Sequence, residues 1–227
     1  MNLDWRYERK FAVEQMSLNE AESILFCNNM FFSELYYKRQ VNNIYLDSIY
    51  MDAYYTNVEG LGNRKKYRVR WYGALFSKIK SPILEVKVKS GIVGSKYKYQ
   101  LNEFELGRLF QTETLEQLFS NSSLPKNVNF ELSSVDPVLI NTYWRKYYMS
   151  ANGNYRVTID TNLEYFSVQR GLNNIVSSAL QSGIVIEIKY SVENDEHVDR
   201  ISQLFPFRLT RSSKYVQGIS MSSGLHY

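Results

Sequence analysis

Basic side chains recur at every second position in short apolar segments of this chain. In KKYRVRWYG they are Lys66, Arg68 and Arg70, with Val or aromatic residues between them. Side chains two residues apart on a β-strand share one face and lie about 6.5–7 Å apart. This spacing suits the phosphoryl groups of a linear anion, because Arg offers forked donors to phosphate oxygens and Lys offers a compact charge.

Four further segments show the same alternation and mix carboxylates with the cations. RYERKFAV, ILEVKVKS, YRVTIDTN and GIVIEIKYS contain Glu8, Glu85, Asp160 and Glu187. A single strand of this kind is more often half exposed, with its charges in water. All five alternating segments would have to be half-exposed strands for that interpretation to explain the whole chain. The pattern therefore favours a barrel whose charged lining binds a polyanion.

The carboxylates have two roles open to them in such a lining. They can pair with Lys and Arg while the site is empty, or they can hold a divalent metal against the phosphates. Mg²⁺ and Mn²⁺ prefer oxygen ligands and often take one or two carboxylates plus substrate oxygens. We expect Mn²⁺ or Mg²⁺ as cofactor. Glu187 is the first candidate ligand, and Glu8, Glu85 and Asp160 are further candidates.

Composition limits the class of protein. The chain has 227 residues, 44% of them hydrophobic, and we expect one domain spanning residues 1–227. A net charge of +4 is too small to indicate a nucleic-acid coat, so no nucleic-acid partner is expected. The single cysteine, Cys27, rules out a disulfide framework within the chain. Because no segment has the length of a signal-peptide core or a membrane span, we expect a cytoplasmic protein.

Other common catalytic patterns are missing from the sequence. There is no G-x-x-x-x-G-K-[ST] loop, no G-x-G-x-x-G and no G-x-S-x-G. The two histidines, His197 and His226, have no companions at metal-ligand spacing. The charged alternating segments therefore carry the functional hypothesis alone.

The elements that must position these residues follow from periodicity. Alternation predicts strands at 5–13, 42–47, 64–72, 82–90, 96–100, 163–169 and 184–191, with a hairpin formed by 139–149 and 154–161. Helical spacing predicts helices at 18–28, 102–120 and 195–204, the first capped by Ser17 and Glu20. Residues 121–129 and the segment around Lys214 are interpreted as loops. The fold class is α+β, mostly antiparallel β, with helices outside a barrel.

Seven short pieces in this order resemble the VTC domain of the triphosphate tunnel metalloenzyme (CYTH-like) superfamily. They are RYERKF at 6–11, NNIYLDS at 42–48, KKYRVRWYG at 65–73, LEVKVK at 84–89, RVTIDTNL at 156–163, IEIKY at 186–190 and SSKYVQGI at 212–219. The resemblance covers almost the whole chain. It implies an eight-stranded antiparallel tunnel with helices packed outside.

The resemblance also implies metal-dependent phosphoryl transfer on ATP, tripolyphosphate or polyphosphate. Polyphosphate synthesis from ATP is the first expectation; a triphosphatase or polyphosphatase, or a polyphosphate-binding sensor without turnover, is the alternative. The residues expected to hold the reacting phosphates are Arg68, Arg70, Arg145, Arg156 and Lys189. Further phosphate ligands implied by motif position are Lys10, Lys87 and Lys214, with Lys66, Lys89 and Lys98 as second choices and as a candidate exit path.

The sequence departs from the family pattern at one position. Many tunnel hydrolases and cyclases begin with E-x-E-x-K on the first strand, whereas this chain has Arg6-x-Glu8-x-Lys10. Loss of one carboxylate disfavours a two-metal hydrolase and favours a polymerase-like tunnel with one tight metal. The chain also lacks the membrane helices of the eukaryotic complexes, so coupling to export would need a separate membrane partner.

Overall fold

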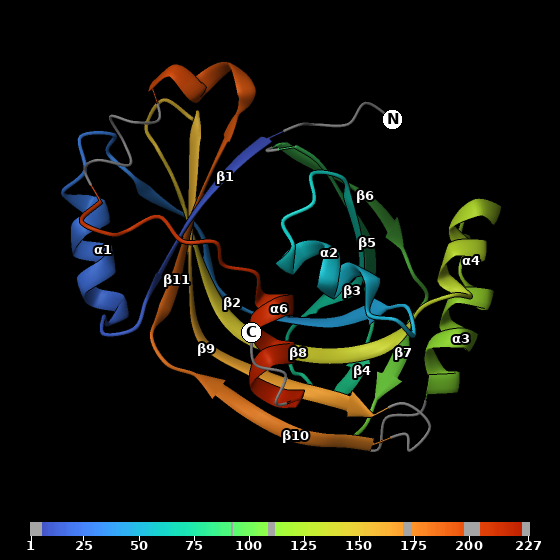
Figure 1. The fold of residues 1–227 in the computed structure, drawn as a ribbon. Coiled ribbons are helices and arrows are strands. Elements are labelled where there is room, and N and C mark those ends of the chain that lie inside the picture. Colours follow the sequence, from blue (N-terminus) through green and yellow to red (C-terminus); the bar gives the residue numbers. More distant parts are fainter. Residues whose placement is uncertain (1–5, 92, 109–111, 170–173, 198–204, 224–227) are drawn as a thin grey trace.

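The computed structural model describes residues 6–91, 93–108, 112–169, 174–197 and 205–223 (Figure 1). Its strands are β1 (Arg6–Val13), β2 (Ser33–Asp47), β3 (Arg64–Tyr72), β4 (Ser77–Ile79), β5 (Ile83–Ser90), β6 (Val93–Gln100), β7 (Phe104–Leu106), β8 (Asp136–Met149), β9 (Tyr155–Gln169), β10 (Asn174–Gln181) and β11 (Ile184–Ser191). Its helices are α1 (Leu18–Phe26), α2 (Asp52–Val58), α3 (Thr112–Asn121), α4 (Lys126–Leu132), the 3₁₀ helix η1 (Val192–His197) and α6 (Lys214–Ser223). None of the helices in these ranges combines the length and apolar character that crossing a membrane requires.

Eight antiparallel strands close into a barrel, as predicted. Their order is β9-β11-β1-β6-β5-β3-β2-β8, and β8 pairs back with β9. Strand β10 extends the sheet beyond β9. The seam between β1 and β6 is the weakest join, because among the described residues only Arg6 and Gly94 are paired across it. Closure gives the charged faces of the strands a common interior.

Register brings the predicted charges together across neighbouring strands. Lys66 lies opposite Lys87, and Arg68 lies opposite Glu85. On the other side of the barrel Lys10 lies opposite Glu187. Residues directly opposite each other in an antiparallel pair point to the same face. The alternating apolar positions therefore face outward, where they pack against helices.

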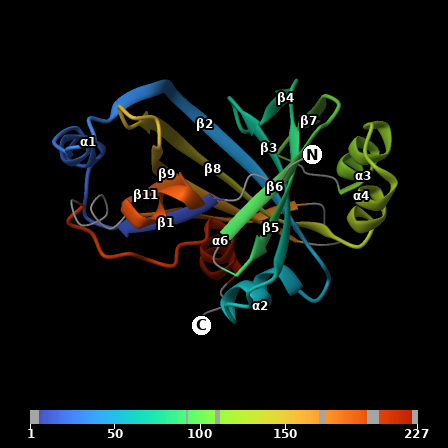
Figure 2. The same cartoon turned by 90° about the horizontal axis from the view of Figure 1, so that it is seen from above.

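Two apolar clusters fill the outer layer between strands and helices. Helix α1 packs Ala21 and Leu25 against the outer faces of β9 and β11, and α3 and α4 cover β3 and β5. Figures 1 and 2 show α1 and the α3–α4 pair on opposite flanks of the barrel. The predicted capping box is confirmed, since Ser17 accepts from the Glu20 amide and Glu20 Oε2 accepts from the Ser17 amide.

A third cluster lies at one end of the barrel, where α6 packs on the inner face. Tyr215 stacks on Tyr45 at 5.3 Å between ring centroids. At Gly218 an added Cβ would come within 2.5 Å of Leu139 and Tyr165, so only glycine permits this close approach. Figure 2 shows α6 beside α2 on one side of the molecule.

Some sequence-based assignments are wrong. Residues 102–120 do not form one helix: Phe104–Leu106 is strand β7, paired with β4, and α3 begins at Thr112. Apolar residues at 104 and 106 fit a strand as well as a helix, and pairing with Ser77–Ile79 decides the outcome. The predicted loop at 121–129 contains the start of α4, and the segment around Lys214 begins α6. The predicted helix at 195–204 begins instead as η1, and residues 198–204 lie outside the described ranges.

Candidate functional site

Glu187 is the central carboxylate of the barrel interior. It is 7% exposed, and three cations surround it: Lys189 Nζ at 2.9 Å, Lys10 Nζ at 3.5 Å and Arg145 Nη2 at 4.0 Å. Burial raises the pKa of Glu187, but Lys189 and Lys10 outweigh burial and hold the pKa well below its usual range. Glu187 is therefore an anion in the empty barrel, and its three cations are partly committed to it.

A second carboxylate, Glu8, reaches the same lysine and bridges the weak seam. Its Oε2 lies 3.7 Å from Lys10 Nζ and 2.9 Å from Lys87 Nζ. Burial and the nearby Glu187 raise the pKa of Glu8, but Lys87 and Lys10 lower it to about 2. Because Glu8 is on β1 and Lys87 is on β5, this ion pair spans the side on which β1 and β6 share a single register pair.

Asp160 lies deeper and is held by two cations. Arg145 contacts it through Nε at 2.5 Å and Nη2 at 2.6 Å, and Lys214 Nζ lies 2.6 Å from Oδ2. Lys214 comes from the first turn of α6, which places it inside the barrel. Tyr143 lies between these groups, with Arg145 and Lys214 each about 5 Å from the ring centroid. The tyrosine hydroxyl accepts a hydrogen bond from Arg70 Nη2 at 3.2 Å.

On the facing strands, Glu85 gathers three cations. Arg68 Nε lies 2.7 Å from Glu85 Oε2, Lys96 Nζ lies 2.6 Å from Oε1, and Arg70 Nη1 lies 3.6 Å from Oε2. Burial raises the pKa of Glu85, but Arg68 and Arg70 hold it well below its usual range. Burial lowers the pKa of Lys96 to about 7, despite the opposing effect of Glu85.

Lys66 lies at the end of the interior covered by α6. Its Nζ is 3.4 Å from Ser213 Oγ, and Lys10 Nζ donates to the Ser212 carbonyl at 3.1 Å. Burial, followed by repulsion from Lys87 and Lys10, lowers the pKa of Lys66 to about 6. Lys66 has no carboxylate at hydrogen-bond distance among the described residues, so an incoming anion would stabilise its charged form.

Three buried polar groups on the inner faces have no hydrogen-bond partner among the described residues. They are Asn141 Nδ2, Arg156 Nε and Thr158 Oγ1. Arg156 and Thr158 alternate on β9, where they lie opposite Lys189 and Glu187. An unmade hydrogen bond on a buried group costs about 1–3 kcal/mol, so such groups are rare without a ligand or water. Their position among cations indicates a site built for an anion that accepts hydrogen bonds.

The donors around Glu187 fit a divalent metal bound together with phosphate. Glu187 and Glu8 flank the same ammonium group of Lys10, and burial together with the nearby Glu187 raises the pKa of Glu8. Mg²⁺ often takes one or two carboxylates and completes its shell with water and substrate oxygens. Among the described residues no three acidic, His or Cys side chains form a cage by themselves. Glu85 and Asp160 are instead engaged by arginines, as described above.

Most sequence-predicted residues meet in one interior, and register places the last two, Lys89 and Lys98, on strands that line it. Lys89 lies opposite Arg64, at the start of β3, whereas Lys98 lies opposite Glu85. Lys66 and Lys89 thus share an end of the barrel, whereas Lys98 lies level with Glu85, and an exit path through these three lysines stays a prediction.

Sequence reasoning missed several interior residues. The structure adds Lys96, Asn141 and Tyr143 to the site, together with Thr158, which alternation in the sequence already places on one face with Arg156 and Asp160. A local signal existed for Lys96 and Tyr143, because each lies two positions from a residue already singled out, Lys98 and Arg145. The neutral side chain of Asn141 gave no such signal.

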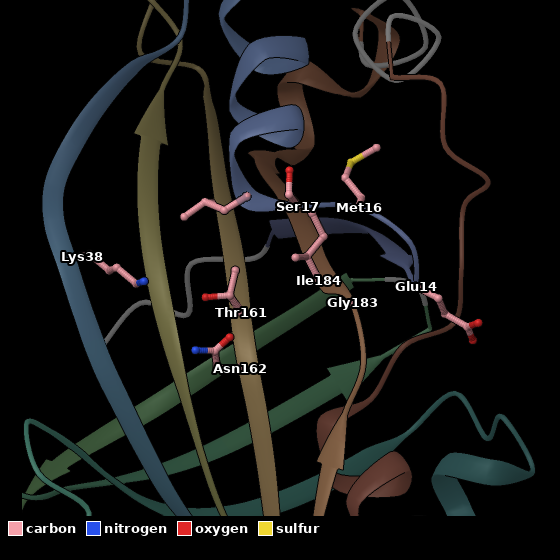
Figure 3. A pocket seen from close by; sticks show the side chains of 9 residues that line it. Glu14, Met16, Ser17, Lys38, Thr161, Asn162, Gly183 and Ile184 are labelled. Carbon is pink, nitrogen blue, oxygen red and sulfur yellow. The ribbon is translucent and has the colours of Figure 1, made fainter.

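A separate hollow of about 340 Å³ lies outside this interior, between α1, β9 and the turn before β11 (Figure 3). In Figure 3 Lys38 points toward Thr161 and Asn162, while Glu14 points away. None of the residues predicted to bind phosphate lines this hollow. It is therefore distinct from the charged interior.

Comparison with known proteins agrees with this architecture. The model of the VTC domain family matches residues 5–223. A putative adenylyl cyclase from Hippeastrum, described as having a dominant triphosphatase activity, superposes with a TM-score of 0.51 and is 14% identical; the match covers 96% of this chain and 95% of that one. A conserved hypothetical protein from Pyrococcus furiosus gives a TM-score of 0.50 and 14% identity, with 94% and 99% of the two chains covered. No curated protein matches the chain significantly. The family match spans nearly all of the sequence, and the chain belongs to the VTC domain family.

Proposed function

We propose that this protein catalyses metal-dependent phosphoryl transfer on linear phosphates within its barrel, and that its reaction is polyphosphate synthesis from ATP. The observation that carries the proposal is the set of buried donors without partners, Asn141, Arg156 and Thr158, inside a cationic lining. A chain of phosphoryl groups supplies acceptor oxygens at every step. It would satisfy these donors and the lysines at once.

The residues divide the work by position. Arg68 and Arg70 hold phosphates from one wall, and Arg145, Arg156 and Lys189 hold them from the other. Phosphoryl transfer depends mainly on positioning and on stabilising charge over the phosphoryl oxygens, which is what these fixed cations provide. In synthesis the terminal oxygen of a phosphate chain forms a bond to the γ-phosphorus of ATP, the bond to the bridging oxygen breaks, and ADP leaves.

A divalent metal would be held by Glu187 and Glu8. When bound, Mn²⁺ or Mg²⁺ would neutralise charge on the phosphoryl oxygens. The lysines beside these carboxylates would then be released to the phosphates, because a metal on Glu187 would take the place of its ion pairs with Lys10 and Lys189. Binding of metal and of phosphate should therefore be cooperative.

Hydrolysis of triphosphate is the second candidate. The barrel has the fold of a protein described as having triphosphatase activity, although 14% identity supports fold alone. Water rather than a phosphate chain would attack the same phosphorus, and orthophosphate would be released. A sensor without turnover is less favoured, because a pure phosphate sensor gains nothing from burying Glu187 and Glu8 among its cations.

The deciding experiment is incubation with ATP and Mn²⁺, then with ATP and Mg²⁺, followed by gel electrophoresis of the phosphate products. Long chains together with ADP would support synthesis. Orthophosphate released from tripolyphosphate, with no chains formed under any condition, would overturn synthesis in favour of the triphosphatase. An Arg68→Ala variant should lose either activity. Lys65→Ala is the matched control, because Lys65 lies on the outer face of β3 and pairs with Glu131 at 2.5 Å.

A further inference from the structure

One arginine of the barrel lining is surrounded by tyrosines instead of carboxylates. The guanidinium carbon of Arg39 lies 4.6 Å from the ring centroid of Tyr36, 5.3 Å from that of Tyr147 and 5.5 Å from that of Tyr72. No ion pair of Arg39 with a carboxylate is present in the described part of the chain. We call these four residues the aromatic rim.

The aromatic rim continues directly into the charged interior. Arg39 on β2 lies opposite Arg145 on β8, and Tyr36 lies opposite Tyr147. The Tyr147 ring lies near both arginines, with the guanidinium carbons of Arg39 and Arg145 at 5.3 Å and 6.0 Å from its centroid. Because Arg145 contacts Asp160 and approaches Glu187, the rim directly adjoins the phosphate-binding groups.

The rim lies at the end of the barrel away from α6. Helix α6 packs near Tyr45 and Leu139, whereas Arg39 and Tyr147 lie toward the opposite ends of the same two strands. Tyr36 and Tyr72 are 46% and 47% exposed, so part of each ring is available to a ligand. A molecule that enters here meets aromatic rings first and arginines next.

We infer that the aromatic rim binds the nucleoside of a nucleoside triphosphate whose phosphates lie in the barrel, an inference that rests on the proposed function. Nucleobases stack on aromatic rings, and a guanidinium adds cation–π attraction and free edge donors. A bare phosphate chain has no π-face and gains little from tyrosine rings. The order of groups, aromatic outside and cationic inside, matches the order of base and phosphates in a nucleotide.

Calorimetric titration of the full chain with ATP and with tripolyphosphate tests this assignment. Tyr72→Leu and Arg39→Lys should each weaken ATP binding about tenfold, in line with the loss of one stacking partner, and leave tripolyphosphate binding unchanged. Arg39→Lys keeps the positive charge and removes the planar stack. Tyr37→Leu is the matched control, because Tyr37 is next to Tyr36 in β2 and is 92% exposed.

The remaining outcomes separate this inference from the proposed function. Equal weakening of both ligands by Arg39→Lys would assign Arg39 to phosphates and overturn the nucleoside site. No weakening of ATP binding by either variant would also overturn it. If the wild-type protein binds ATP but not tripolyphosphate, the nucleoside site at the aromatic rim would be supported and the proposed polyphosphate chemistry would be contradicted. A protein that binds neither would defeat both.

Discussion

The two ends of the barrel interior are built from different chemistry. At one end the aromatic rim surrounds Arg39 with tyrosines that are partly exposed. At the other end, Arg64, Lys66 and Lys89 lie close together, and burial, followed by repulsion from neighbouring cations, lowers the pKa of Lys66 and Lys89. The carboxylates Glu8, Glu187 and Glu85 lie between the two ends. A tunnel that handled only symmetrical phosphate chains would not need this asymmetry, so the difference indicates that a ligand enters with its two ends distinguished.

The largest expected effect on activity is at Arg68, which lies in the middle of the barrel interior, between its two ends. Arg68→Ala should lower kcat/KM for ATP by about 30- to 1,000-fold, the loss typical of one preorganised donor to a developing charge. It should weaken tripolyphosphate binding as well, because Arg68 faces phosphates in either ligand. Steady-state kinetics and calorimetry check this, with Lys65→Ala as control. Selective loss of ATP alone would mean that Arg68 belongs with the aromatic rim.

The next largest effect is on stability, and it concerns α6, the helix at the end of the barrel that contains Lys66 and Lys89. Asp47 is buried and accepts from the amides of Ser48, Ala53 and Tyr54 and from the Tyr215 hydroxyl. Asp47→Ala leaves these donors unsatisfied and should cost about 2–3 kcal/mol of unfolding free energy in urea denaturation. Tyr215→Phe removes one of the four hydrogen bonds and should cost about 1 kcal/mol. Similar losses for the two variants would show that Asp47 does not anchor α2 and α6 together.

A smaller, selective effect is expected at the basic end. Lys89→Ala should weaken binding of long polyphosphate about tenfold at low salt, the effect of one charged hydrogen bond. Tripolyphosphate, which the middle of the barrel can hold, should be affected little. Titration with chains of increasing length measures the difference. A loss independent of chain length would place Lys89 within the central site and remove the distinction between middle and end.

The smallest expected effect is a pH dependence of phosphate binding, which we assign to Lys66 at the basic end of the barrel. The pKa of Lys66 is lowered to about 6, so Lys66 is mostly neutral in the free protein at pH 7.5. A bound phosphate raises that pKa, and binding must take up a proton. Affinity for tripolyphosphate should therefore fall by several-fold as pH rises from 6 to 9. Calorimetry in buffers of different ionisation enthalpy should detect the proton.

Lys66→Arg provides the control for this pH dependence, since arginine stays charged throughout the range. The variant should flatten the part of the pH profile that the ligand itself does not cause. Linkage gives a second check on the same group. Between pH 6 and 10 the unfolded chain binds the Lys66 proton and the folded chain does not, so the free energy of unfolding should rise with pH in the wild type. An identical slope in Lys66→Arg would contradict the assignment to Lys66.

The sequence by itself determined which side chains share one face of each strand. Alternation places Lys66, Arg68 and Arg70 on one face of a strand whatever its neighbours, because a period of two is a local property of the extended backbone. The capping box of Ser17 and Glu20 is local as well, and both predictions hold. The apolar positions 104 and 106 were ambiguous for the same reason: over so short a stretch, local periodicity fits two structures.

Only the tertiary structure decided which of these residues meet. Glu85 is held by Arg68 and Lys96 because β3 and β6 both flank β5, and no local pattern specifies that order. Lys214 enters the barrel because Tyr215 and Gly218 dock α6 on the inner face, a contact between segments far apart in the chain. The aromatic rim likewise exists only once Tyr36, Tyr72 and Tyr147 converge from three strands on Arg39. Register and closure depend on packing between distant segments, which alternation within one strand does not encode.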